Sequence, residues 1–340
     1  MKNLHFFDKV IFFLNIVFAL LLLFSYALPY GFLSQFPLVS VLSLMLPVFL
    51  LINFIFLLYW LLKFKKQSLL SFFILLAGYP HILSFYKFFS SPTPEKTSED
   101  VSIMTYNVRL FNAYRWIEKE SVAEDIISLI REASPDILCI QEFYLEQENA
   151  FTRYPYRYIE NKSPTQKNGQ AIFSRFPIIN KGSLAFPRTS NSAVYVDVVK
   201  GKDTVRIYNL HLESLRIHPG EEPLTQENSG RMFKRMATAF SIQQSQVEIF
   251  EAHARKCPYK KIVCGDFNNT QYSHIYRRIK KDRKDSFTEA GKGFGRTFNF
   301  GYFPVRIDFI LADETIEILA HKNYTEKYSD HFPVLALLRF

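Results

Sequence analysis

Six short polar motifs follow one another between residues 104 and 331, and each lies within or directly after an apolar, strand-like run. They are Met104–Arg109, Ile140–Glu142, Asn209–Glu213, Gly265–Asn268, Arg306–Ile310 and Ser329–His331. Together they contain two His, five acidic residues and three Asn. A sheet can hold such groups rigidly while leaving them open to a ligand. These residue types are sufficient to bind a hard cation and to activate a water molecule.

On these motifs the chain resembles the endonuclease/exonuclease/phosphatase superfamily, which includes deoxyribonuclease I, apurinic-site endonucleases, neutral sphingomyelinases and inositol-polyphosphate 5-phosphatases. The most specific motifs are Gly265-Asp266-Phe267-Asn268 and Ser329-Asp330-His331. The resemblance implies an α/β fold, a four-layer sandwich of two packed mixed β-sheets flanked by helices. It also implies metal-dependent hydrolysis of a phosphate ester, but it does not name the substrate, because a shared fold does not carry substrate identity.

Three residues are predicted to hold the metal, which we expect to be Mg²⁺ or Mn²⁺ because oxygen ligands select hard cations. The resemblance assigns the metal-binding glutamate to Glu142, and Asn107 offers a neutral oxygen beside that metal. Asp330 matches an acid that reaches the metal directly or through water. Taken alone, the Gln141-Glu142 motif would favour an exposed acid at a strand end, and Asn107 reads equally as a residue of a turn that ends the strand.

Five residues are predicted to act on the phosphate and the attacking water. His331 takes a proton from water or stabilises the transition state, since an imidazole titrates near neutrality, and the resemblance supplies Asp308 to fix its tautomer. Asp266 orients or deprotonates the water, and Asn268 donates to a phosphoryl oxygen. His211 matches a histidine that binds a phosphoryl or leaving-group oxygen. A lone strand histidine is more often structural, and the sequence does not identify an acid that orients His211.

The first 90 residues have a different character, typical of a membrane region. Residues 10–62 form a run of 53 residues without Asp, Glu, Lys, Arg or His. A membrane-spanning helix needs about 20 apolar residues, so this run accommodates two helices, with a turn predicted at Pro29–Pro37. A third apolar stretch, Ser68–Tyr86, is interrupted by Gly78-Tyr79-Pro80-His81. We therefore expect two or three helices in residues 1–90, a linker over residues 91–100 and a catalytic domain over residues 101–340.

The basic residues near the predicted helix ends bear on orientation, because Lys and Arg are enriched on the cytoplasmic side. Lys2 and Lys9 flank the first segment and Lys63, Lys65 and Lys66 follow the second, whereas the predicted turn has none. Both ends of this hairpin therefore favour the cytoplasm. If Ser68–Tyr86 spans the membrane, the catalytic domain is extracytoplasmic, which is our prediction. If that stretch lies at the interface instead, the domain stays in the cytosol.

The net charge of +9 does not indicate a nucleic-acid-binding surface. Residues 1–90 contribute +5 of it, which leaves +4 for the other 250 residues. A duplex-binding domain usually has a strong and clustered basic excess. One basic cluster, Arg277–Lys284, is either a solvated helix face or a surface for phosphates. The three cysteines, Cys139, Cys257 and Cys264, show no disulfide or zinc spacing, and we expect them to be buried.

Strands and helices alternate along the catalytic part. Strands are predicted at Val101–Tyr106, Ile137–Ile140, Gln170–Ser174, Ile178–Leu184, 194–198, 205–207, Lys261–Cys264, Arg306–Leu311 and Val334–Phe340. Helices are predicted at Ala123–Ala133, Arg231–His253 and Ser273–Lys281 from their apolar spacing. The polar segment Leu215–Gly230 is expected to be a loop at the rim of the pocket.

The sequence therefore predicts a membrane-anchored phosphoesterase with a lipid or small phosphoester substrate, bound to the bilayer through its N-terminal helices. Two alternatives remain. A surface nuclease would keep the chemistry and act on DNA or RNA, with salt-sensitive binding. A silent scaffold of the same fold would have a degenerate set of site residues. No protein partner is inferred.

Overall fold

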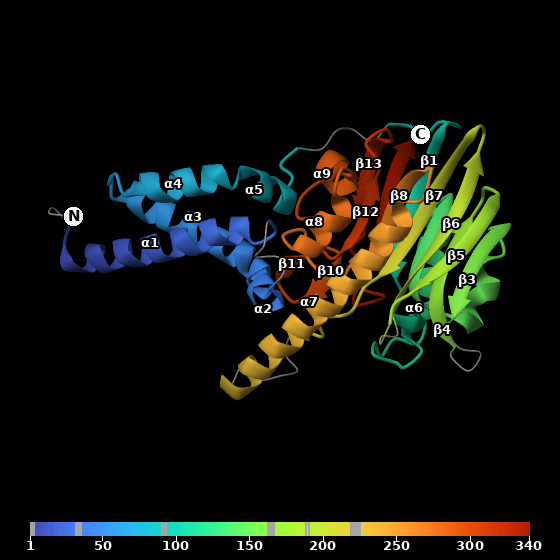
Figure 1. The fold of residues 1–340 in the computed structure, drawn as a ribbon, viewed down its shortest axis with the longest axis horizontal. Coiled ribbons are helices and arrows are strands. Elements are labelled where there is room, and N and C mark those ends of the chain that lie inside the picture. Colours follow the sequence, from blue (N-terminus) through green and yellow to red (C-terminus); the bar gives the residue numbers. More distant parts are fainter. Residues whose placement is uncertain are drawn as a thin grey trace.

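The N-terminal part of the chain is a bundle of helices. The computed structural model describes residues 4–30, 36–89, 94–161, 167–187, 189, 191–217 and 226–340 (Figure 1). The helical bundle consists of α1 (Phe6–Ala27), α2 (Pro37–Ser40), a 3₁₀ segment (Val41–Met45), α3 (Leu46–Leu62), α4 (Ser68–Ala77) and α5 (Tyr79–Phe85). The segments Phe6–Ala27 and Pro37–Leu62 are each long and apolar enough to cross a membrane. Helices α4 and α5 meet at 68° and could together form a third span.

Polar side chains join the bundle helices internally. The Asn15 amide of α1 donates to Ser71 Oγ of α4 at 2.8 Å and accepts from Trp60 Nε1 of α3 at 3.1 Å. Asp8 near the start of α1 pairs with Lys63 at the end of α3. The start of α1 and the end of α3 therefore lie at the same end of the bundle, and the start of α3 lies at the other.

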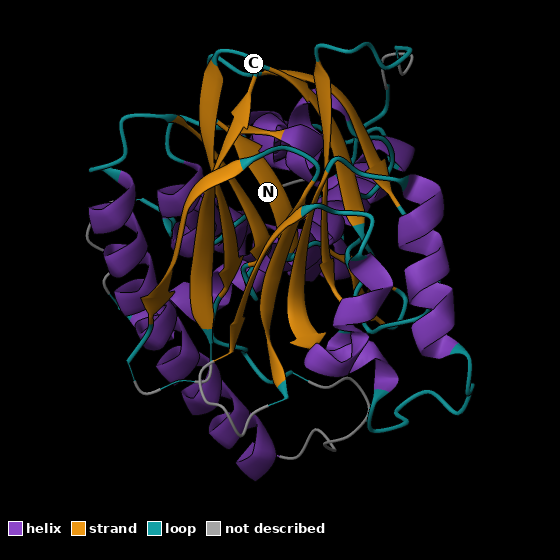
Figure 2. Ribbon diagram, turned by 90° about the vertical axis from the view of Figure 1, so that its right-hand side faces the viewer, coloured by secondary structure: helices purple, strands orange, loops and turns teal. Residues whose placement is uncertain are grey.

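The rest of the chain forms two six-stranded mixed sheets packed face to face, which confirms the predicted α/β sandwich (Figure 2). Sheet I has the order β13-β14-β1-β2-β4-β3, and sheet II has the order β5-β6-β7-β8-β12-β9. The strands of sheet I are β1 (Asp100–Asn107), β2 (Ile137–Tyr144), β3 (Tyr156–Asn161), β4 (Asn168–Ser174), β13 (Glu317–Asn323) and β14 (Val334–Arg339). Those of sheet II are β5 (Ile178–Ala185), β6 (Ser192–Lys200), β7 (Asp203–His211), β8 (Lys260–Asp266), β9 (Lys284–Asp285) and β12 (Asp308–Ala312). A separate hairpin pairs β10 (Phe298–Phe300) with β11 (Phe303–Val305).

Helices cover the outer faces of both sheets. Helix α6 (Val122–Ala133) packs on sheet I, and α7 (Gln226–Ala254) and α8 (His274–Lys280) pack on sheet II. The short helix α9 (Ser286–Ala290) follows β9. The core between the sheets is made of small and β-branched residues that alternate along the strands, as expected where two sheets interdigitate. All three cysteines are buried and free, as predicted, and Cys139 and Cys264 lie in this layer.

Several predicted boundaries differ from the structure for identifiable reasons. The strand predicted at Arg306–Leu311 begins only at Asp308, because the N–H groups of Ile307 and Asp308 donate to Thr297 Oγ1. Strand β2 continues four residues beyond Ile140, past an irregularity in its pairing with β4. Strands β3, β9, β10, β11 and β13 were not predicted. Their polar or short sequences, such as those of the edge strands β3 and β13, lack an apolar pattern.

The rim loop predicted for Leu215–Gly230 is wrong at both of its ends. Leu215 is buried in the core under α7, and Gln226–Gly230 form the first turns of α7. Residues 218–225 lie outside the described residues. The periodic apolar pattern of α7 starts at Met232, which explains why the sequence places the beginning of this helix too late.

The helical bundle is docked against the sandwich through the end where α1 finishes and α2 begins. Val41 joins the core under α7, and the Arg277 guanidinium lies 3.7 Å from the centre of the Tyr30 ring. The carbonyl of Ser84 in α5 accepts from Gln271 and Arg306 of the sandwich. In Figure 1 the bundle extends to the left of the sandwich, with the N-terminal end farthest away. The two parts are therefore in direct contact.

Candidate active site

Strand pairing brings the six motifs to one end of the sandwich. Asn107 ends β1 and lies opposite Gln141 of the parallel strand β2, next to Glu142. His211 ends β7 opposite Asp266, which ends β8. Asp266 in turn pairs with Asp308 at the start of β12. All eight predicted site residues are described, and the contacts below connect them.

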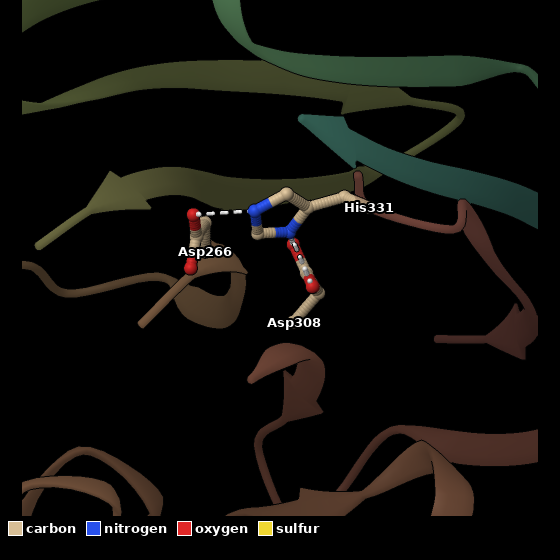
Figure 3. A group of neighbouring side chains, drawn as sticks. All are labelled: Asp266, Asp308 and His331. Carbon is tan, nitrogen blue, oxygen red and sulfur yellow. Dashed lines mark hydrogen bonds and ion pairs between the residues drawn. The ribbon is translucent and has the colours of Figure 1, made fainter. Parts of the chain in front are cut away.

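Three buried side chains form a connected chain, in which His331 is hydrogen-bonded to Asp308 and lies at ion-pair distance from Asp266 (Figure 3). His331 Nδ1 lies 3.0 Å and 3.2 Å from the two carboxylate oxygens of Asp308. On the other side of the ring, His331 Nε2 lies 3.6 Å from Asp266 Oδ2. Each side chain exposes no more than 6% of its surface. Asp308 thus faces one ring nitrogen, which leaves Nε2 turned towards Asp266.

The Asn107 side chain connects this chain to Glu142. Asn107 Nδ2 donates to Asp266 Oδ2 at 3.1 Å and to Glu142 Oε1 at 3.2 Å. Its Oδ1 accepts from the backbone N–H of Arg109 at 3.1 Å. Glu142 has a φ of 50° at the irregularity in β2, which turns its carboxylate away from the ladder, and 33% of its side chain is exposed. Two acids from different sheets therefore meet on one amide.

His211 belongs to the same cluster. Its Nε2 lies 3.8 Å from Asp266 Oδ2 and 3.9 Å from Glu142 Oε1. These are the acids near His211 that the sequence does not identify. Both distances exceed that of a hydrogen bond, and the His211 side chain is 15% exposed. The imidazole is therefore within reach of both carboxylates and of a ligand placed between them.

The turn after β8 depends on Gly265. Its φ of 128° suits glycine, and a Cβ at this position would lie 2.0 Å from the Leu210 carbonyl oxygen of β7. This close approach sets Asp266 beside His211. The backbone N–H of Asn268 then donates to Asp266 Oδ1 at 2.8 Å. The Asn268 amide donates to Leu212 O and Asp266 Oδ2, so its donors now face the protein.

Asp330 lies beside His331 at the outer side of the cluster. The Ser329 hydroxyl lies 2.9 Å from the Asn107 carbonyl oxygen, to which it donates, and 3.2 Å from Asp330 Oδ1. Asp330 Oδ2 is 3.4 Å from Arg109 Nη1, and the Arg109 guanidinium stacks on Trp116. Arg109 therefore lies at the edge of the cluster.

The crowding of acids shifts the protonation equilibria of the cluster. Burial, aided by the neighbouring Asp308 carboxylate, raises the pKa of Asp266 to about 6, against the opposing effect of His331. Burial alone would lower the pKa of His331, but the Asp308 and Asp266 carboxylates outweigh it and hold this pKa well above its usual value. Desolvation also raises the pKa of Glu142, against the hydrogen bond from Asn107. Such shifts in a connected group are typical of reactive sites.

Comparison with known proteins decides the family. Residues 104–331, two thirds of the chain, match the Endonuclease/Exonuclease/phosphatase family, from the first polar motif to the last. The chain belongs to this family. Members of the family hydrolyse phosphate esters. Residues 8–85 match a second family, described as a domain of unknown function (DUF8431). No curated protein matches the chain.

Solved structures of the Endonuclease/Exonuclease/phosphatase fold resemble the sandwich. A Bacteroides vulgatus endonuclease/exonuclease/phosphatase has a TM-score of 0.56 and 18% identity, over 72% of this chain and 100% of that one. The Bacteroides thetaiotaomicron mannosyl-6-phosphatase has a TM-score of 0.52 and 18% identity, over 71% and 100%. Truncated Caenorhabditis elegans TDP2 has a TM-score of 0.52 and 16% identity, over 71% and 98%. At these identities the likeness establishes the fold.

The donor set fits the divalent metal on which Endonuclease/Exonuclease/phosphatase proteins generally depend. Glu142 and Asp266 converge on the Asn107 amide, and no Lys or Arg of the described residues forms an ion pair with either acid. A separate group, Asp266, Asp308 and His331, offers ligand atoms within 4.8 Å of one another. In this second group, Asp308 and His331 are already hydrogen-bonded to each other. Glu142 and Asp330 are more exposed and face outwards.

Sequence reasoning missed residues that support the Endonuclease/Exonuclease/phosphatase site from outside its motifs. Thr297 Oγ1 accepts from the Ile307 and Asp308 N–H groups and so sets the start of β12. The Phe298 ring packs edge-on against the His331 ring at 5.0 Å. Gln243 of α7 donates to the backbone carbonyls of Glu213 and Asn268. None of these residues belongs to a motif, and each acts through tertiary contacts that the sequence does not show.

Proposed function

We propose that the protein is a metal-dependent phosphoesterase that hydrolyses a phosphodiester or phosphomonoester by direct, in-line attack of water. The observation that carries this proposal is the chain Asp308–His331–Asp266, joined through Asn107 to Glu142 at one end of the sandwich. A complete set of site residues in mutual contact argues against a silent scaffold. The reaction class agrees with that of the family.

The proposed roles follow from the contacts. Asp308 faces His331 Nδ1 and thereby keeps the proton on that nitrogen, so Nε2 is presented to the phosphate and to Asp266. Asp266 orients the attacking water, and its raised pKa brings it closer to that of a general base working near neutral pH. His211 stabilises charge on a phosphoryl or leaving-group oxygen. Asn268 would have to release Leu212 O before it could donate to the substrate.

Glu142, Asn107 and Asp330 would hold the metal, for which Mg²⁺ is the first candidate. When bound, such an ion neutralises phosphoryl charge and increases the acidity of coordinated water. For Asn107 to serve through its carbonyl oxygen, its amide would turn over, since Oδ1 now accepts from Arg109 N–H. In the structure, Asn107 Nδ2 lies between the carboxylates of Glu142 and Asp266 and donates to both. A positive charge is favourable at this position.

For the substrate, we propose a lipid or a small phosphoester. The helical bundle offers two or three candidate spans and contacts the sandwich directly, which would hold the site near a bilayer. The fold relatives include a mannosyl-6-phosphatase and TDP2. Neither relative fixes the substrate of this chain. A nuclease remains the alternative, and the modest +4 charge outside residues 1–90 disfavours it.

We also propose that residues 1–90 form the membrane region, residues 91–100 connect it to the sandwich, and the catalytic domain of residues 101–340 is extracytoplasmic. Lys63, Lys65 and Lys66 lie at the end of the bundle where α1 starts, and such residues favour the cytoplasm. The sandwich contacts the opposite end, at Tyr30 and Val41. The pair α4–α5 returns from the lysine end to the sandwich, which supports a third crossing.

The substrate proposal is tested with the full chain in a mild detergent. Hydrolysis of a plasmid, a phospholipid dispersion and a bis-aryl phosphate would be compared with Mg²⁺ present, for wild type, His331→Gln and the exposed control His5→Gln. We expect cleavage of the lipid or of the bis-aryl ester, lost in His331→Gln and retained in His5→Gln. Rapid plasmid nicking that depends on His331 would establish the nuclease instead. For topology, a cysteine-labelling reagent that cannot cross membranes should reach Lys202→Cys, and not Lys66→Cys, in intact cells.

A further inference from the structure

A second cavity lies at the catalytic end of the sandwich, on the edge of sheet I. It has a volume of about 600 Å³ and lies between the loop 291–297, the end of β13 and the segment 324–332. The last of these segments leads directly into His331, and Phe332 lines the cavity. The cavity and the candidate active site therefore share a wall while remaining separate spaces.

The cavity is lined by four cationic side chains and by no carboxylate among the described residues. The four are Lys292, Arg296, Lys322 and Lys327. Within the part of the chain that the structure describes, none of them forms an ion pair with an acid. The Lys322 ammonium rests over the Tyr324 ring at 4.4 Å, and it also borders a neighbouring acidic hollow that contains Asp125. Unpaired cations around a hollow of this size favour an anionic occupant.

Arg296 and Lys322 are held in place by aromatic rings, whereas Lys292 and Lys327 are free to adjust. Arg296 stacks on the Phe332 ring at 5.1 Å, and its guanidinium bonds to Asn299 and to the Gly301 carbonyl. Lys292 and Lys327 are exposed. His321 in the wall adds little charge near neutral pH, because burial lowers its pKa to about 4. The positive charge of the cavity thus comes from the three lysines and Arg296.

The cavity lies on the side of the sandwich that the helical bundle contacts. Phe294 lines the cavity and packs edge-on against Phe85 and Tyr86, at the point where α5 ends. Lys87, one residue further, bonds to the carbonyl of Thr288 and pairs with Gly293. Figure 1 shows β13 on the side of sheet I that is nearest to the bundle. A chain anchored through α1 and α3 would therefore carry this cavity close to the bilayer surface.

We infer that this cavity binds the phosphate-containing headgroup of an anionic phospholipid in the bilayer, and so holds the catalytic end of the sandwich against the membrane. The inference rests on the proposed membrane anchoring. Lys292, Lys322 and Lys327 contact the phosphate, and Phe294 and Tyr324 border the acyl chains of the lipid. Basic clusters next to membrane segments recognise anionic headgroups in this way. The bound lipid is not the reacting ester, since none of the eight predicted site residues lines the cavity.

The test measures binding of dihexanoyl phosphatidylglycerol to the full chain in a neutral detergent, by calorimetry, with a chelator present to prevent hydrolysis. The triple variant Lys292→Gln/Lys322→Gln/Lys327→Gln removes three exposed charges and is matched by Lys202→Gln/Lys256→Gln/Lys281→Gln, whose positions lie outside the cavity. We expect at least roughly tenfold weaker binding for the cavity variant and unchanged binding for the control. Dihexanoyl phosphatidylcholine should bind more weakly than phosphatidylglycerol to the wild type.

Equal loss in both triple variants, or no loss in the cavity variant, would overturn the inference. The inference would also be overturned if inorganic phosphate bound as tightly as phosphatidylglycerol and displaced it. The cavity would then be a site for free phosphate. The cavity variant should hydrolyse a soluble bis-aryl phosphate within about twofold of wild type, which also shows that it is folded. A wild type without hydrolysis but with selective headgroup binding would contradict the proposed function and leave this inference standing.

Discussion

The helical bundle and the sandwich both bury polar side chains, but they arrange them differently. In the bundle, the neutral Asn15 amide donates to Ser71 Oγ and accepts from Trp60 Nε1. In the sandwich, the carboxylates of Asp266, Asp308 and Glu142 are gathered around one histidine and one amide. Like charges held this close lower stability, whereas paired neutral groups fix helix packing. The polar contacts of the bundle therefore fix helix packing, whereas those of the sandwich gather the candidate site residues at the expense of stability.

The largest predicted effect comes from breaking the charged network at Asp308. Asp308→Asn keeps the shape of the side chain and removes the carboxylate that fixes the His331 tautomer. We expect a loss of about 10³–10⁴-fold in kcat on a bis-aryl phosphate, by analogy with other histidine–carboxylate pairs. The matched control is Asp313→Asn, at a carboxylate after the other end of β12 that bonds Lys261 N–H. Comparable losses in the two variants would mean that the effect is structural.

A substitution at Gly265 tests the close approach of β8 to β7, which places Asp266 beside His211. Gly265→Ala forces a Cβ to within 2.0 Å of the Leu210 carbonyl, so β7 and β8 must separate. We expect the free energy of unfolding to fall by about 2–4 kcal/mol, with loss of activity. Gly201→Ala is the control, because its φ is also positive, at 61°, but nothing lies within 4 Å of the added Cβ. It should cost about 1 kcal/mol and leave activity intact. A tolerated Gly265→Ala would contradict the described strand spacing.

A substitution inside the bundle should lower stability less than Gly265→Ala does, and it should not change hydrolysis. Asn15→Leu removes the hydrogen bonds to Ser71 and Trp60 from the interior of the bundle. We expect about 1 kcal/mol lower stability in detergent, the usual size for a polar contact between membrane helices. Hydrolysis of a soluble bis-aryl phosphate should not change. A large loss of activity would show that the bundle helps to shape the catalytic site, through contacts such as Arg306 to Ser84.

The sequence predicts those parts of the molecule that depend on local pattern. The predicted helix Ala123–Ala133 lies within one residue of α6, and the predicted strands at 194–198 and 205–207 lie inside β6 and β7. The apolar run at residues 10–62 contains most of α1 and all of α3. The two-sheet architecture and the membership of Glu142, Asp308 and His331 in one site came from the family resemblance. Their contacts across the two sheets could not be derived from spacing.

Other features depend on tertiary contacts that leave no local trace. The edge strands β3 and β13 are polar, and they form because a neighbouring strand pairs with them. The Thr297 hydroxyl oxygen accepts hydrogen bonds from two backbone N–H groups, and no sequence motif predicts these contacts. The beginning of α7 precedes its apolar stripe, and the docking of α5 onto the sandwich depends on Arg306, which reads in the sequence as part of a strand.

The central claim is that Glu142 holds a metal beside the chain Asp308–His331–Asp266. The most direct measurement is hydrolysis of a bis-aryl phosphate by the full chain after treatment with a chelator, during titration with Mg²⁺. Glu142→Gln is compared with wild type and with the exposed control Glu132→Gln. We predict that wild type and Glu132→Gln recover fully, and that Glu142→Gln requires at least about tenfold more Mg²⁺. Activity that survives the chelator, or a Glu142→Gln variant with an unchanged Mg²⁺ requirement, would contradict the claim.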